Sequence, residues 1–129
     1  MIEIQRSIDV EDEIRIALKD YLTVYCRPLP KSYDLPNILI TQVGGTDQDG
    51  QIDTFDVTLD ARAKNSADAN EYLRNAIGVL RKVAKDQTTA IRYVTVNASG
   101  SWGTDPVRPD LSMCSARIRV VAHLESISI

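Results

Sequence analysis

The first helical pattern lies near the start of the chain. From Val10 to Tyr25, apolar residues recur three and four positions apart, which predicts an amphipathic helix with one apolar stripe. Asp9 or Ser7 can cap its start, and three acids in the first turn suit the helix dipole. The two prolines within Arg27–Pro30 end the helical pattern, because proline disfavours helix at the residue before it.

A second helix is predicted from a cap at Asn65 or Ser66 to about Lys85. Its apolar positions again repeat at helical spacing, with acids near the start and bases near the end. Gly78 stands in the middle, where glycine costs up to about 1 kcal/mol relative to alanine. It is therefore either tolerated there or a point where another element approaches closely.

Four other segments have the patterns of strands. Phe55–Ala63 and Cys114–Leu124 alternate apolar and polar residues, Asn37–Val43 is a short apolar run, and Ile91–Ala98 is rich in β-branched residues. The glycine- and aspartate-rich stretch Gly44–Gly50 predicts a turn that joins the first two strands into an antiparallel hairpin.

The elements thus follow in the order helix, strand, strand, helix, strand, strand. This order predicts an α+β fold, with a four-stranded, mainly antiparallel or mixed sheet that carries two helices on one face. With 129 residues and no linker, the chain 1–129 is expected to form a single domain.

Charge and cysteine content exclude several classes of protein. A net charge of −3 disfavours tight binding to duplex nucleic acid, which relies on clustered lysine and arginine. Cys26 and Cys114 are far apart and in apolar settings, which predicts buried free thiols in a reducing compartment. The first residues resemble no signal peptide, and no apolar run is long enough to cross a bilayer, so we expect an intracellular, soluble protein.

Candidate catalytic or metal-binding residues do not form a set. Asp47–Asp56 weakly matches a calcium loop, but its first position would be Gly45, and a hairpin turn explains the same residues. His123 and Cys114 lie at opposite parities of one predicted strand and so point to opposite faces. We therefore expect no catalytic residues, cofactor or metal, and a protein that is not an enzyme.

Two charged rows lie on polar strand faces. Asp56 and Asp60 share one such face, and Arg117 and Arg119 share another. Both rows are commonly just solvated surface. The alternative is that they pair with each other, either within the sheet or across a subunit boundary.

The stretch Gly100–Asp110 holds the only tryptophan together with two glycines and two prolines, which predicts a loop between two strands. Trp102 has three possible roles: packing back on its own sheet, lining a ligand pocket, or contacting another chain, since tryptophan is enriched at binding hot spots. The contact role is preferred. The candidate interface residues are then Trp102, Asp105, Arg108, Asp110, Arg117 and Arg119.

The layout resembles that of the tail terminator, or tail completion, proteins of long-tailed bacteriophages and prophages. The resemblance covers nearly the whole chain and rests on the hairpin NILITQVGG…DTFDVTLDARA, the helix ADANEYLRNAIGVLRKVA, and the loop WGTDPVRPD followed by a strand with Arg117. A neighbouring head-tail joining family has a similar layout.

The resemblance implies a structural role in virion assembly. Members of that family form a ring, usually a hexamer, that caps the tail tube and docks to the head connector, while DNA passes through the bore. The implied partners are other copies of this chain, the tail tube protein and the connector protein, with neither sequence-specific nucleic acid nor membrane. The implied location is the virion tail, assembled in the cytoplasm of the bacterial host, and Asp56 and Asp60 would face the bore. The alternative is a small-ligand or enzyme domain with a pocket near Trp102–Asp110.

Overall fold

The computed structural model describes the backbone of residues 1–48 and 52–129, and the side chains of these residues except 46–48 and 98–101. Within this part of the chain there are two helices and seven strands. In chain order they are β1 (Glu3–Arg6), α1 (Val10–Leu18), β2 (Val24–Cys26), β3 (Asn37–Gln48), β4 (Ile52–Ala63), α2 (Ser66–Asp86), β5 (Ile91–Thr104), β6 (Ser112–His123) and β7 (Glu125–Ser128).

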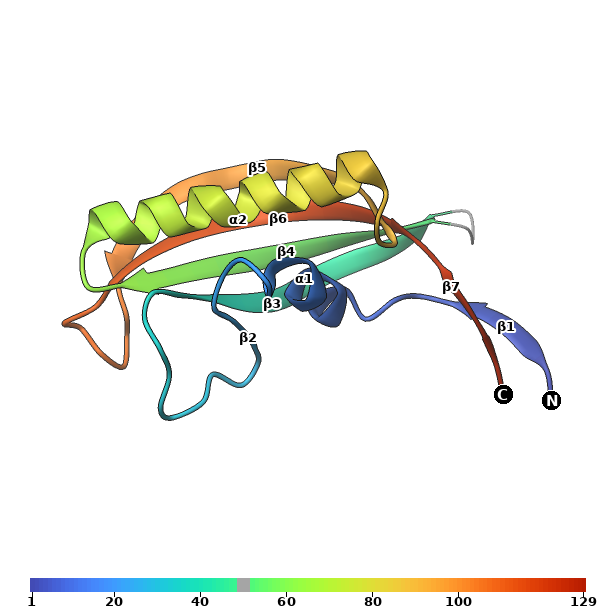
Figure 1. Ribbon diagram of the computed structural model, residues 1–129, viewed down its shortest axis with the longest axis horizontal. Coiled ribbons are helices and arrows are strands. Elements are labelled where there is room, and N and C mark those ends of the chain that lie inside the picture. Colours follow the sequence, from blue (N-terminus) through green and yellow to red (C-terminus); the bar gives the residue numbers. More distant parts are fainter. Residues whose placement is uncertain (49–51) are drawn as a thin grey trace.

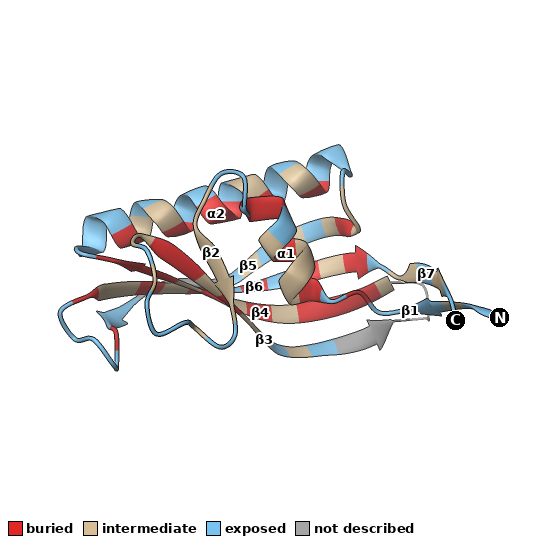
Figure 2. Cartoon of the chain, turned by 60° about the horizontal axis from the view of Figure 1, so that its bottom comes forward, coloured by how far each residue is buried: buried red, intermediate tan, exposed pale blue. Residues whose placement is uncertain are grey.

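The main sheet has the order β2-β3-β4-β6-β5, and both helices cover one of its faces (Figures 1 and 2). β2 runs parallel to β3, and every other neighbouring pair is antiparallel. Alternate residues of the strands point towards the helices and form one apolar core, which includes Ile40, Leu59 and Ile118 with Ile14 and Leu80 of the helices. The predicted α+β class, the mixed sheet and the two helices are confirmed.

The predicted single four-stranded sheet is wrong. The main sheet gains β2 at one edge, and a separate two-stranded sheet pairs β1 with β7. β2 lies inside the segment predicted as the end of the first helix, which instead stops at Leu18. Val24 pairs with Ile38 of β3, so tertiary pairing overrides the helical spacing of the apolar residues there.

The predicted turn at Gly44–Gly50 is also wrong in part, because β3 continues through Gly44 and Gly45 to Gln48. A Cβ atom on Gly45 would lie 2.9 Å from the carbonyl oxygen of Thr54 on β4. Glycine is needed there for close approach within the ladder rather than for a turn. Asp49 and Gly50, which the calcium-loop alternative would need, lie outside the described residues.

The long loop predicted between the last two strands of the main sheet is shorter than expected. β5 extends to Thr104 and pairs Trp102 with Cys114 of β6, after irregular register between Ala98 and Ser101. Only the segment from Asp105 to Leu111, which contains both prolines, leaves the sheet. The composition of Gly100–Asp110 correctly predicted that the chain leaves the sheet here, but it placed the start of the loop too early.

The two chain ends form a terminal arm, the ribbon of β1 and β7 with Ile2 and Ile129. The arm projects beyond the end of the main sheet (Figure 1). Ile2 and Ile129 exchange two backbone hydrogen bonds of 2.7 and 2.9 Å, which continue the ladder to its tip. At the base, the Ser7 hydroxyl donates a hydrogen bond to the Asp53 carboxylate of β4. On the C-terminal side, the arm begins at Glu125, just after β6 ends at His123 and the chain leaves the main sheet.

Candidate interaction surfaces

The segment Asp105–Leu111 is organised around one buried carboxylate. Asp105 accepts hydrogen bonds from the backbone amides of Val107 and Arg108, at 2.9 and 3.2 Å. Its second oxygen accepts from Nε of Arg62 on β4 at 2.7 Å, and the side chains of this ion pair are only 9% and 4% exposed. Asp105 therefore closes its own segment onto the sheet and is not available as a surface contact.

The ionisation of Asp105 follows from these bonds. Burial tends to raise the pKa of its carboxyl group, but the hydrogen bonds from the Val107 amide, the Arg62 guanidinium and the Arg108 amide outweigh that effect. The net result is a pKa below its ordinary range, so the carboxylate stays charged at neutral pH. Nη1 of Arg62 is buried and has no hydrogen-bond partner among the described residues.

The other loop residues predicted as interface are exposed. Arg108 and Asp110 form an ion pair with each other at 2.9 Å, with side chains 50% and 63% exposed. Trp102 lies in β5 on the helix-bearing face and is 53% exposed, while Val107 is 87% exposed. The apolar groups that this end of the molecule offers to a partner are Trp102 and Val107, and sequence reasoning missed Val107.

A cavity of about 410 Å³ lies beneath the same segment. Asp105 and Arg108 line it, as the pocket alternative expected, but Trp102 and Asp110 do not. Its other walls come from the segment after β2, from β4 and from the Asp105–Leu111 segment itself: Leu29, Pro30, Lys31, Tyr33, Arg62, Pro106 and Val107.

The charged rows lie on the open face of the sheet, opposite the helices. The register places Asp56 beside Arg119, and the two form an ion pair at 3.1 Å. Asp60 accepts a hydrogen bond of 2.5 Å from the Ser115 hydroxyl, and Arg117 lies beside Thr58. Pairing within the sheet is thus found for one of the two acids. Because Arg117 and Arg119 share this face with Asp56 and Asp60, its charges are mixed.

The cysteines and the histidine do not come together as a reactive pair. Cys114 is buried in the core, whereas His123 is exposed at the end of β6. Cys26, expected to be buried, is half-buried instead, and both thiols are free. Burial raises the pKa of both thiols, so little thiolate forms at neutral pH. Among the described residues no three histidine, cysteine or acidic side chains gather as a metal site.

β5 is the long outer strand of the main sheet, and no strand of the described chain pairs with its outer edge. Tyr93 projects from it and is 71% exposed. Sequence reasoning counted Tyr93 only as part of a strand. The alternation of residues in this strand could have indicated which face Tyr93 occupies. Nothing in the sequence identified β5 as an edge strand of the sheet.

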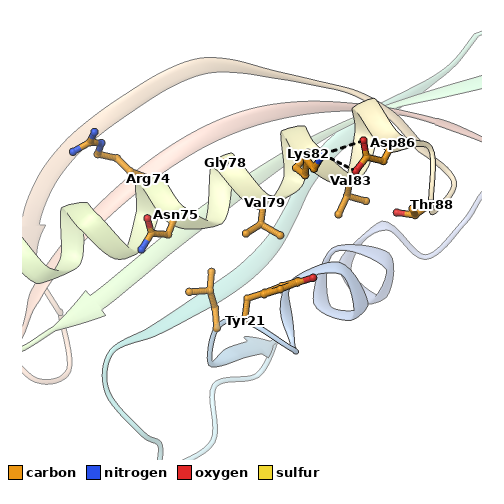
Figure 3. A pocket seen from close by; sticks show the side chains of 10 residues that line it. Tyr21, Arg74, Asn75, Gly78, Val79, Lys82, Val83, Asp86 and Thr88 are labelled. Carbon is orange, nitrogen blue, oxygen red and sulfur yellow. Dashed lines mark hydrogen bonds and ion pairs between the residues drawn. The ribbon is translucent and has the colours of Figure 1, made fainter.

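A groove of about 650 Å³ runs between α2 and the segment that follows α1 (Figure 3). Tyr21 and Leu22 form one wall, and Val79 and Val83 of α2 form the apolar part of the other. The tyrosine ring lies across from the two valines and is 71% exposed. The other lining residues, mostly polar, are Arg74, Asn75, Gly78, Lys82, Asp86 and Thr88.

Comparison with known proteins adds no relative. No protein-family model matches the chain, and no curated protein sequence matches it. Neither described helix combines the length and apolar character needed to cross a membrane.

Proposed function

We propose that this chain is a structural protein of virion assembly, which forms a ring on the tail tube of a long-tailed phage and joins it to the head connector. The observation that carries the proposal is the edge strand β5, fourteen residues long and free on one side, with Tyr93 and Trp102 exposed along it. Free edges accept strands or side chains of other chains, and exposed aromatics supply binding energy.

The irregular register of β5 supports a specific contact. The register shifts near both Ile91 and Ala98, which leaves two regular stretches, Tyr93–Val96 and Ser101–Thr104, and Trp102 lies in the second. Bulges in edge strands prevent indiscriminate pairing, so they restrict a partner to the regular stretches. A protein that acts through contacts with its own copies, rather than through catalysis, needs such a restricted edge.

The open sheet face is the candidate for the bore. It carries Asp56 and Asp60 with Arg117 and Arg119, and so has little net charge. DNA binding is dominated by phosphate contacts to clustered basic groups. A balanced face gives DNA little to hold, which suits passage. Asp56 and Asp60 thus keep the bore-facing role that the resemblance implies, with the two arginines beside them.

Sedimentation velocity of the chain, with and without purified tail tubes, tests the proposal. We expect the chain to bind at one end of the tubes, and the Trp102→Ala variant to bind at least tenfold more weakly. Its thermal stability should change little, because more than half of the tryptophan surface is already in water. A chain that ignores tail tubes would contradict the function. An equal loss of stability and binding in Trp102→Ala would remove the tryptophan from the interface.

The cavity under Asp105–Leu111 favours a second candidate, the binding of a small anionic molecule. Its volume lies within the usual range for ligand sites, and Lys31, Arg62 and Arg108 line it. Thermal shifts with a panel of small carboxylates and phosphates test this alternative. A rise in melting temperature that Arg108→Ala abolishes and Trp102→Ala retains would support it, and no shift with any compound would exclude it for this panel.

A further inference from the structure

The terminal arm presents an apolar face on which no helix or third strand of the described residues packs. The register pairs Ile4 with Ile127, and Ile2 pairs with Ile129 at the tip, so the four isoleucines share one side of the ribbon. Ile2 and Ile129 are 59% and 65% exposed. The opposite side carries only polar residues, Glu3, Gln5, Ser126 and Ser128.

Such a ribbon is not expected to be stable on its own. Two strands without a third strand or a packed helix are marginal in water. The arm is amphipathic, and its isoleucine side lacks the layer of other residues that covers the apolar face of a stable sheet. The arm is therefore built to pack against something beyond its own chain.

The groove between α2 and the segment after α1 is the complementary feature. Its apolar wall groups, Leu22, Val79 and Val83, form a strip beside an exposed tyrosine. Gly78 lies in its lining, and a Cβ atom added there would meet no other atom within 4 Å. No described helix or strand therefore packs so closely on Gly78 that only glycine would fit. The open space beside it can admit a side chain of another molecule.

Charge favours a second copy of this chain as the occupant. From residue 74 to 86, α2 carries four bases against the single acid Asp86: Arg74, Arg81, Lys82 and Lys85. The arm and the start of α1 are acidic, with one base, Arg6, against the acids Glu3, Asp9, Glu11, Asp12, Glu13 and Glu125. The carboxylates of this set repel one another. The pKa of Glu13 is raised, first by burial and then by the charges of Asp12, Glu125 and Asp9. A neighbouring basic helix would relieve it.

We propose that the isoleucine face of the terminal arm of one copy packs into the groove between α2 and the segment after α1 of the next copy. Arm and groove are different surfaces, so the contact is heterologous: each copy gives an arm and receives one, and repetition closes into a ring or continues as a filament. The contact goes beyond the proposed function, because it does not depend on tail tubes or on the β5 edge.

Sedimentation velocity of the full chain over a concentration range measures the association. We expect the wild-type chain to associate, and Ile4→Ser with Ile127→Ser to weaken association at least tenfold. The matched control is Gln5→Ala with Ser126→Ala on the polar side of the same ribbon, which should associate like the wild type. A wild-type chain that stays monomeric throughout, or equal losses in the two arm variants, would overturn the proposal.

A variant of the groove guards against effects of misfolding. Gly78→Leu adds a side chain where space is open and replaces a poor helix former with a good one. We expect its melting temperature to be no lower than that of the wild type, while its association falls at least tenfold. Unchanged association in this stable variant would overturn the groove as the receptor.

Cross-linking identifies the occupant. An Ile127→Cys chain is mixed with an Asn75→Cys chain and treated with a short bismaleimide, with Glu71→Cys on the same helix outside the groove as the control. The native thiols react slowly because Cys114 is buried, Cys26 is half-buried and the pKa values of both are raised. A mixed dimer with Asn75→Cys but not with Glu71→Cys supports the proposal. A chain carrying both Ile127→Cys and Asn75→Cys that links only to itself overturns the intermolecular contact.

Tail tubes separate this proposal from the proposed function. Loss of self-association with tube binding retained, in the isoleucine variant, supports the arm contact between copies. Loss of tube binding without any change in self-association assigns the arm to the tube protein and overturns the proposal, while leaving the assembly function in place.

Discussion

The two ends of the molecule each hold an arginine–carboxylate pair of nearly equal length. At one end, Arg62 and Asp105 are 2.7 Å apart and almost fully buried. At the other, Arg6 and Glu125 are 2.6 Å apart at the base of the terminal arm, with side chains 56% and 36% exposed. Distance alone does not separate these pairs, whereas burial does, because water screens the second pair and not the first.

The difference shows which end of the molecule has its charged and apolar groups covered by its own chain. The segment after β5 has its carboxylate surrounded by donors of its own chain. The arm has its polar pair largely in water and the two isoleucines at its tip, Ile2 and Ile129, exposed. Sequence composition drew attention to the first end as a contact loop. The structure shows that much of that loop serves its own fold, and that the arm is the part without a partner.

The largest expected effect comes from breaking the buried pair. Arg62→Ala should lower the free energy of unfolding by about 3 to 5 kcal/mol, because Asp105 is then left charged and buried without its cation. Urea denaturation measures the loss. The control is Arg62→Ala with Asp105→Ala, which removes both charges and should cost less than the sum of the single variants. Additive losses would mean that the pair does not act as a unit.

Acid should weaken the same end of the molecule. The pKa of Asp105 is lower in the folded chain than in the unfolded one, so the unfolded chain binds the proton more readily. Its stabilising contribution is complete above the ordinary pKa of an aspartate and is lost as pH falls through that value towards the folded one.

Asp105→Asn gives the measurement. Unfolding free energies of the wild type and the variant are compared between pH 6 and pH 3, and the gap between them should narrow as pH falls. A gap that stays constant would show that the charge of Asp105 contributes nothing, and that only its hydrogen bonds do.

The sequence predicted the helices and the antiparallel core well, because their apolar periodicity is the packing itself. The N-cap Asn65 and the alternation of Phe55–Ala63 are examples that the structure retains. It failed where local pattern and tertiary pairing disagree. Val24 and Tyr25 continue the helical spacing, but they lie in β2 and pair with β3. Gly45 lies in a stretch with the composition of a turn, but it is part of β3 and packs closely against β4.

The candidate surfaces were harder to predict for the same reason. Trp102 and Arg119 could be named from composition, but the role of Asp105 depends on Arg62, 43 residues away along the chain. The arm had a local signal, since IEIQ near the start and SISI at the end both alternate apolar and polar residues. Neither segment shows by itself that it pairs with the other, because their contact joins the two ends of the chain.

The smallest expected effect is at the exposed pair. Arg6→Gln should change the free energy of unfolding of the dissociated chain by less than about 1 kcal/mol, since exposed ion pairs contribute little against water and salt. The effect should shrink further in 0.5 M salt, where screening is strong. Urea denaturation of Arg6→Gln and Arg62→Ala in low and high salt makes the comparison direct. A loss at Arg6 that matches the loss at Arg62 would mean that the base of the arm is desolvated, and that the arm is already covered in the wild-type protein in solution.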